Sequence, residues 1–169
     1  MITITKEFSF DMAHRLEGHD GLCNNIHGHT YKLLVTIMRP DGSVKSDLTS
    51  SDRGMVWDFK TLKDAVKLVI LDKVDHSFMY NSIDKDSTDI ALFMKKRINQ
   101  KLCPVPFRAT AENMVSWIFE ELEEFFITTS YDIVITKIQL YETPTSYAIW
   151  ELAPNKITEY TTKYIPDED

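Results

Sequence analysis

The sequence is poor in cysteine and contains no long apolar run. Its 169 residues include two cysteines, Cys23 and Cys103, which are too few and too isolated for a disulfide framework. No apolar run approaches the roughly 20 residues that a membrane-spanning helix needs. The first residues, MITITKEFSF, have neither the basic nor the apolar region of a secretory signal. We therefore expect a reduced, cytoplasmic protein that does not enter a membrane.

Positive charge is also scarce. The 19 lysines and arginines are outnumbered by 26 aspartates and glutamates, which gives a formal net charge of −7, and the basic residues are scattered along the chain. Binding to nucleic acid or to an anionic membrane requires a basic stripe on the surface. The composition therefore argues against both partners, and an anionic substrate must be met by a small local group of basic side chains.

Apolar residues make up 43% of the chain, which is enough for the core of one domain. We expect this domain to span residues 1–169. Alternating apolar and polar residues predict strands, and apolar residues at helical spacing predict helices that begin at the N-caps Asp58 and Thr110. The predicted strands are residues 2–16, 29–40, a short returning strand at 54–59, 131–143 and 146–152; the predicted helices are residues 59–73 and 110–126.

This order of elements indicates an α+β fold with helices on one face of an antiparallel sheet. Residues 84–107 interrupt the pattern, because DIALFMKKRINQ can form a short helix whereas LCPVPF cannot continue it through two prolines. We treat this segment as an insertion of open shape. The acidic end, IPDED, is expected to be frayed.

The motif HGH is the first sign of a reactive site. In a strand, His27 and His29 point to the same face about 6.6 Å apart, and Gly28 adds no bulk between them. His14, at the end of the first strand, offers a third imidazole on a face that also carries Phe8. Three neutral imidazoles suit zinc and leave one coordination position open, as in catalytic sites. The alternative, a polar turn that enters a strand, is about equally compatible with this short motif alone.

Cys23 lies in the loop just before this motif. A nearby dication would stabilise its thiolate, which is the environment of a reactive cysteine. It can instead be the fourth ligand of a closed structural zinc site, although such sites usually take cysteines in close pairs and the chain has no CxxC. Cys103 receives no role, and His19 is interpreted as a solvated loop residue.

Asp75 and His76 directly follow the first predicted helix. The helix dipole and the adjacent carboxylate both favour the imidazolium form, which can donate or relay a proton. For an isolated Asp-His pair, however, a C-terminal helix cap is the commoner role.

Glu142 shares a strand face with apolar residues, and a carboxylate at the end of an apolar stripe needs a partner. A ligand with N–H donors would supply one. A salt bridge at the end of the strand is the alternative.

Taken together, HRLEGHDGLCNNIHGHTYKL, GMVWDFKTLK, the DH of KVDHSF, TAEN and YET resemble the 6-pyruvoyl-tetrahydropterin synthase / 6-carboxy-tetrahydropterin synthase family. The resemblance covers most of residues 4–150. It implies a tunnelling fold, in which a four-stranded antiparallel sheet carries two helices on one face. It also implies a homohexamer made of two trimers, with active sites at subunit interfaces.

The resemblance also implies roles for individual residues. His14, His27 and His29 would hold zinc, Cys23 would be the base, Asp75 and His76 would complete its proton relay, Glu142 would anchor the pterin ring, and Thr110 and Glu112 would line the same pocket. The expected substrate is 7,8-dihydroneopterin triphosphate. Its expected products are 6-carboxy-5,6,7,8-tetrahydropterin, acetaldehyde and triphosphate, on the route to 7-deazaguanine and queuosine.

Two alternatives accompany this interpretation. If the carbon chain of the substrate stays whole, the product is 6-pyruvoyl-tetrahydropterin. The three residues between Cys23 and His27 match the carboxy-forming type, whereas a longer gap is expected of the pyruvoyl-forming enzymes. The other alternative is a zinc-binding homologue without turnover, but such a protein has no use for Cys23, Asp75, His76 and Glu142.

Overall fold

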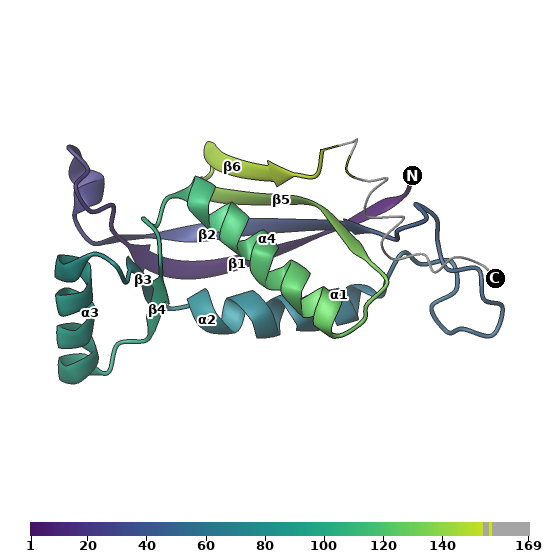
Figure 1. The fold of residues 1–169 in the computed structure, drawn as a ribbon, viewed down its shortest axis with the longest axis horizontal. Coiled ribbons are helices and arrows are strands. Elements are labelled where there is room, and N and C mark those ends of the chain that lie inside the picture. The colour runs from purple at the N-terminus through teal and green to yellow at the C-terminus, as the bar shows by residue number, and fades with distance from the viewer. Residues whose placement is uncertain (154–155, 157–169) are drawn as a thin grey trace.

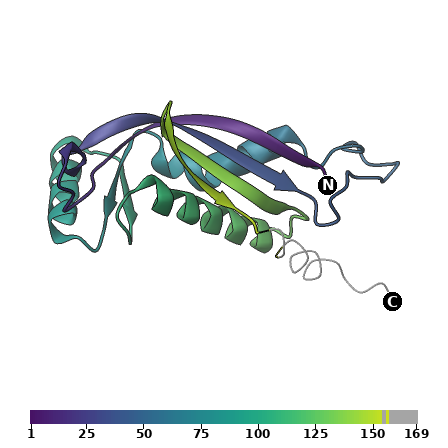
Figure 2. The same cartoon turned by 90° about the horizontal axis from the view of Figure 1, so that it is seen from above.

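The computed structural model describes residues 1–153 and residue 156. Six strands form one mixed sheet in the order β4-β3-β1-β2-β5-β6 (Figure 1). The strands are curved, and the long helix α4 runs beneath them (Figure 2). Within this part of the chain, no helix has the length and apolar character to cross a membrane. The acidic end predicted to be frayed, residues 165–169, lies outside the described residues.

The antiparallel half of the sheet contains four of the strands predicted from the sequence. β1 (Thr3–His14) pairs with β2 (His27–Met38) along their whole length, so that His14 lies opposite His27. β5 (Val134–Thr143) pairs with the other edge of β2, and β6 (Ser146–Glu151) continues from β5 as a hairpin. The alternating pattern therefore located these strands correctly.

Two long helical segments pack against the antiparallel half of the sheet. α1 (Phe59–Val66) continues through a π-helical turn, η2 (Lys67–Leu71), into α2 (Asp72–Val74). Its N-cap is Asp58, whose carboxylate accepts hydrogen bonds from the backbone of Lys60 and Thr61. α4 (Ala111–Thr128) begins after the N-cap Thr110. Both predicted caps and both predicted helices are confirmed.

The hydrophobic core lies between this sheet face and these helices. Tyr31 and Leu33 of β2, Leu62 of α1 and Leu122 of α4 are all fully buried in it. Each large apolar side chain buried in this way stabilises the fold by about 1.5–3 kcal/mol. The face of β2 that buries Tyr31 and Leu33 also carries His27 and His29, because side chains alternate along a strand.

The prediction of a four-stranded antiparallel sheet with two helices is wrong in one respect. β3 (Ser77–Asn81) runs parallel to β1, and β4 (Leu102–Val105) runs parallel to β3, with a third helix, α3 (Lys85–Ile98), between them. Residues 84–107 thus form α3 and β4. Pro104 is tolerated in β4 because that strand is at the edge of the sheet, where a missing N–H is not needed for pairing.

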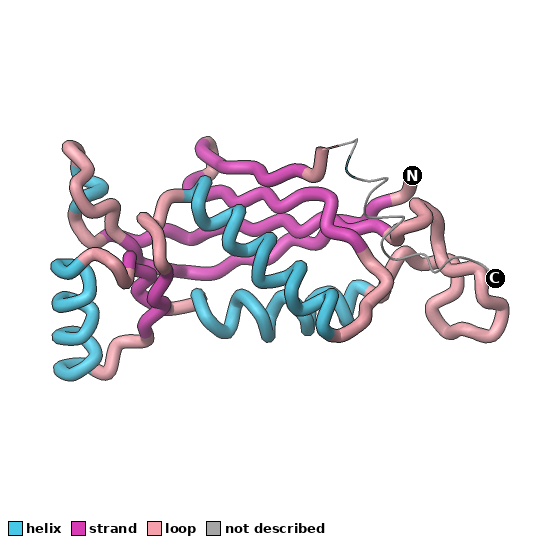
Figure 3. The backbone as a smooth tube through the Cα atoms, in the orientation of Figure 1, coloured by secondary structure: helices cyan, strands magenta, loops and turns pink. Residues whose placement is uncertain are grey.

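The prediction of a short strand at residues 54–59 is also wrong. Both edges of β2 are already occupied, by β1 and by β5, so a returning strand has no place to pair. Val56 and Trp57 are buried instead, and the Trp57 ring packs against Phe126 and Tyr131. The connection from β2 to α1 is a long loop at the end of the molecule opposite α3 (Figure 3).

Candidate active site and metal centre

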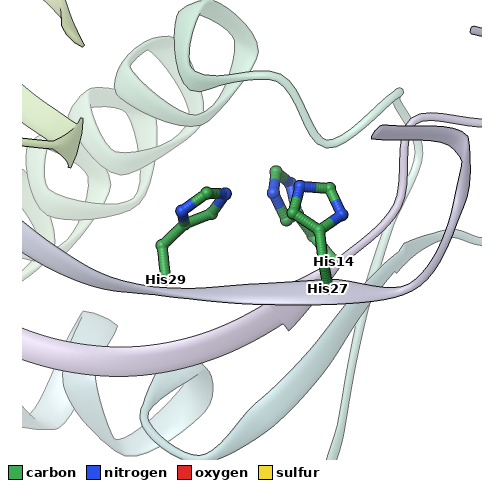
Figure 4. A group of neighbouring side chains, drawn as sticks. All are labelled: His14, His27 and His29. Carbon is green, nitrogen blue, oxygen red and sulfur yellow. The ribbon is translucent and has the colours of Figure 1, made fainter. Parts of the chain in front are cut away.

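Three histidines gather where β1 ends and β2 begins. His14 is the last residue of β1, His27 is the first residue of β2, and His29 follows two residues later on the same face. Their side chains point to the same side of the two strands (Figure 4). One ring nitrogen from each lies within 4.8 Å of the others, so these residues could hold a metal ion.

Two of these rings are oriented by backbone carbonyl groups. Nδ1 of His14 lies 2.8 Å from the carbonyl oxygen of Ala109, and Nδ1 of His27 lies 2.8 Å from that of Asn25. A carbonyl oxygen only accepts, so Nδ1 carries the proton in both rings. In the neutral imidazole Nε2 then has the free lone pair, and this is how metal-binding histidines are usually held.

The surroundings of the cluster also fit a cation. His14 is fully buried, and Nε2 of both His14 and His29 is buried without a hydrogen-bond partner in the described part of the chain. The pKa of His14 is lowered, mainly by burial and further by the charges of His27 and His29. The Ala109 carbonyl group and the Glu142 carboxylate raise this pKa but do not outweigh burial. A neutral imidazole with an unsatisfied Nε2 is the form that binds a divalent metal ion.

Gly28 allows the two strands to approach each other between the histidines. It pairs with Ala13, and a Cβ atom at this position would lie 3.2 Å from the carbonyl oxygen of Met12. Any larger residue would push β1 away from β2 at the point where their imidazoles converge. The close approach of β1 therefore explains why glycine occupies the middle position of HGH.

Glu142 reaches the cluster from β5. Its Oε1 lies 3.4 Å from Nε2 of His14 and 3.9 Å from Nε2 of His29. Burial raises the pKa of the nearby Tyr31, and the charge of Glu142 raises it further. Sequence reasoning missed Tyr31, although its position two residues after His29 places it on the same face.

Cys23 lies in the turn that joins the two histidine strands. It is half-buried in the short helix η1 (Leu22–Asn24), and its carbonyl oxygen accepts a hydrogen bond of 2.8 Å from the backbone of Leu16. The guanidinium of Arg15 holds the same turn through Asn24. Among the described residues, the group able to share a metal ion contains the three histidines without the Cys23 thiol. The structure therefore gives no support to the closed four-ligand alternative.

Asp75 and His76 form a hydrogen-bonded pair, with 2.9 Å between Oδ1 and Nδ1. Burial raises the pKa of Asp75, but the backbone N–H of Asp11, the His76 imidazole and the Lys101 charge together bring it below its usual value. His76 adopts the left-handed backbone conformation, with a φ of 58°, and its side chain is 76% exposed. This is a strained arrangement for a residue other than glycine.

The Asp75–His76 pair lies beside β1, where the backbone N–H of His76 donates a hydrogen bond to the carbonyl oxygen of Asp11. His76 lines a shallow pocket together with Asp11, Thr30 and His29, and the exposed side chains of Asp11 and Thr30 are hydrogen-bonded to each other. No hydrogen bond joins His76 to Cys23 in the part of the chain that the structure describes. One chain therefore brings Glu142 to the histidines but does not assemble the predicted relay.

Thr110 and Glu112 lie at the start of α4, close to the Ala109 carbonyl that holds His14. The hydroxyl oxygen of Thr110 accepts a hydrogen bond from the backbone N–H of Asn113, and Glu112 is exposed in the first turn. Thr110 therefore acts as the N-cap of α4.

The family model for 6-pyruvoyl tetrahydropterin synthase matches residues 3–153. The chain belongs to this family. The resemblance seen in the sequence motifs is thereby confirmed, together with the prediction that the protein belongs to a family of enzymes.

Two curated relatives cover most of the chain. The 6-carboxy-5,6,7,8-tetrahydropterin synthase of Haemophilus influenzae is 45% identical over 153 residues, which is 89% of this chain and 99% of that protein. A protein of the same name from Rickettsia bellii is 32% identical over 151 residues, 87% of this chain and 98% of the relative.

Solved structures confirm the fold. The 6-pyruvoyl tetrahydropterin synthase of Caenorhabditis elegans superposes with a TM-score of 0.60 at 32% identity and covers 90% of this chain and 96% of its own. An uncharacterized protein from Wolinella succinogenes superposes with a TM-score of 0.70 at 21% identity, over 89% of this chain and 97% of that one. The tunnelling fold is thus shared, with the parallel strands β3 and β4 added to the expected antiparallel sheet.

Proposed function

We propose that the protein is a 6-carboxy-5,6,7,8-tetrahydropterin synthase, a zinc-dependent lyase. It would convert 7,8-dihydroneopterin triphosphate and one water into 6-carboxy-5,6,7,8-tetrahydropterin, acetaldehyde and triphosphate. This reaction would take place in the cytoplasm, on the route to 7-deazaguanine and queuosine. The observation that carries the proposal is the cluster of three imidazoles in a chain 45% identical to a synthase of that name along 99% of its length.

The three histidines are the residues that would hold the zinc ion. His14 and His27 keep their protons on Nδ1, against the carbonyl groups of Ala109 and Asn25, and so present Nε2 to the ion. A zinc ion at this position would supply a Lewis acid that makes nearby C–H and O–H protons of the substrate side chain more acidic.

The proton transfers fall to Cys23, Asp75 and His76. Cys23 would take a proton from the substrate side chain as a thiolate, and His76 would return one elsewhere while Asp75 holds its ring. Because no hydrogen bond joins His76 to Cys23 among the described residues, we propose that it serves the site of a neighbouring copy. This arrangement requires an oligomer, for which the family resemblance suggests a hexamer made of two trimers.

The remaining residues would bind the two ends of the substrate. Glu142 would accept hydrogen bonds from the N–H groups of the pterin ring, in a pocket that Thr110 and Glu112 would border. Arg15 and Arg108 are candidates for the triphosphate. Both have guanidinium nitrogens that are buried without a hydrogen-bond partner among the described residues, and a phosphate would satisfy them.

A second candidate function is that of a 6-pyruvoyl tetrahydropterin synthase, which would eliminate triphosphate and leave the carbon chain whole. It is favoured by the 32% identity to the Caenorhabditis elegans enzyme of that name. The higher identity to the Haemophilus influenzae protein and the three residues between Cys23 and His27 favour the carboxy product.

Product analysis by mass spectrometry tests the proposal. Zinc-loaded protein is incubated with 7,8-dihydroneopterin triphosphate beside Cys23→Ala and the matched control Cys103→Ala, whose thiol is buried away from the cluster. We expect carboxytetrahydropterin and acetaldehyde from the wild type and from Cys103→Ala, and neither from Cys23→Ala. Pyruvoyl-tetrahydropterin would establish the second candidate, and an unchanged substrate would indicate a homologue without turnover.

A further inference from the structure

The carboxylate of Glu142 lies close to two of the clustered imidazoles. Its Oε1 is 3.4 Å from Nε2 of His14 and 3.9 Å from Nε2 of His29. Ligand atoms that bind zinc at about 2.0–2.2 Å in a tetrahedron are separated from one another by roughly 3.3–3.6 Å. The carboxylate oxygen is at this distance from His14 and slightly beyond it from His29, and it lies outside the three-histidine group that could hold an ion, so it would have to move toward a bound ion to become a fourth ligand.

An ordinary hydrogen bond does not account for this contact. Nε2 of His14 and of His29 are both buried and have no hydrogen-bond partner among the described residues. The proton of His14 is on Nδ1, where it is donated to the Ala109 carbonyl group. The lone pair of Nε2 therefore faces a carboxylate oxygen, and two electron-rich atoms repel each other unless a cation lies between them.

Glu142 is also placed to move. Its side chain is 28% exposed, whereas His14 is fully buried. It is the second-to-last residue of β5, at a register irregularity between Tyr141 and Thr143 in the pairing with β6. Backbone carbonyl groups hold the rings of His14 and His27, whereas the carboxylate lies on a more exposed side chain at an irregular end of β5 and can turn away more easily.

We propose that in the substrate-free protein Glu142 is the fourth ligand of the metal ion, and that the pterin ring displaces it. This rests on the proposed metal site. Binding of the ring offers N–H donors to the carboxylate, which turns away from the ion to accept them. A coordination position therefore opens only when the ring is in the pocket, and in its absence small molecules are kept from the ion.

Cobalt(II) in place of zinc reports the ligand set directly, because its visible absorption depends on the number and type of ligands. We compare wild type, Glu142→Gln and the matched control Glu151→Gln, an exposed carboxylate of β6, without substrate. We expect Glu142→Gln to change the absorption bands and to weaken cobalt binding by about tenfold or more, since even outer partners of a metal site contribute roughly 10–100-fold. Glu151→Gln should match the wild type in both measurements.

Addition of a pterin that lacks the triphosphate side chain tests the displacement. In the wild type, the spectrum should move toward that of Glu142→Gln as the ring binds, and Glu142→Gln itself should change little. Identical spectra and affinities for wild type and Glu142→Gln would overturn the inference while leaving the metal site intact. A wild type that binds no cobalt, or that binds it equally well after His14→Ala, would overturn the metal site and this inference together.

Discussion

His14 and Ala109 are 95 residues apart in the sequence, and a hydrogen bond of 2.8 Å joins the imidazole Nδ1 of one to the carbonyl oxygen of the other. The bond connects the end of β1 to the residue before the N-cap of α4. It fixes both the tautomer and the orientation of a fully buried ring. The geometry of the candidate metal centre thus depends on how α4 packs against the sheet.

Each histidine of the cluster should be required for metal binding. His14→Ala, His27→Ala and His29→Ala each remove one of three ligands, so the affinity should fall by more than the roughly 10–100-fold that loss of an outer partner causes. Metal content of the purified variants, measured by inductively coupled plasma mass spectrometry, checks this. His19→Ala is the control, because its exposed ring accepts a hydrogen bond from the backbone of Gly21 and does not belong to the three-histidine group. Full metal content in any of the three variants would contradict the assignment.

Gly28→Ala should weaken the metal site without unfolding the protein. The new Cβ would lie 3.2 Å from the Met12 carbonyl oxygen and would move β1 relative to β2 between the imidazoles. We expect metal affinity to fall by about tenfold, as for other changes outside the ligand set, while the circular dichroism spectrum stays the same. Competition with a chelating dye measures the affinity. In the control Gly21→Ala the new Cβ meets only the movable His19 ring, so an equal loss there would argue against this explanation.

Asp75 should stabilise the protein in a way that depends on pH. Its pKa is lower in the folded state than its usual value of about 3.9, despite the opposing effect of burial, because of Asp11, His76 and Lys101. A lowered carboxyl pKa contributes stability that is present above the unfolded pKa and is lost as the pH falls through the folded pKa. The free energy of unfolding should therefore differ between wild type and Asp75→Asn at neutral pH and converge below about pH 4. Urea unfolding from pH 7 to pH 3 measures this, and a difference that grows on acidification would refute it.

Cys23 and His76 should complement each other between chains. If His76 serves the site of a neighbouring copy, Cys23→Ala and His76→Ala are each inactive alone, but mixed oligomers contain sites in which both residues are intact. We expect activity to return when the two variants are unfolded together and refolded as a mixture. Failure of the mixture to recover activity, with mixed oligomers demonstrated by native mass spectrometry, would place the relay within one chain.

The histidine cluster could be predicted because it depends on local rules. A strand places His27 and His29 on one face, and the pairing of β1 with β2 brings His14 opposite His27. Glu142 followed from the same periodicity, since a carboxylate on the apolar face of β5 needed a partner. The structure brings that carboxylate beside the imidazole cluster, with Oε1 3.4 Å from Nε2 of His14.

The remaining features depend on contacts between distant parts of the chain. β3 and β4 are short strands without a clear alternation, and their parallel pairing beside β1 has no signature in the local sequence. The position of His76 is set by its left-handed backbone and by its bond to Asp11, which helical spacing does not predict. The carbonyl group of Ala109 leaves no mark in the sequence, because any residue could provide it.

The most direct test of the account is product formation after removal and return of the metal. The protein is stripped with a chelator, and carboxytetrahydropterin and acetaldehyde are measured before and after addition of zinc. We predict that both products disappear together on chelation and return together with about one zinc ion per chain, as expected for a single site with three histidine ligands. Metal-free protein that releases both products at the rate of the zinc-loaded protein would contradict the account.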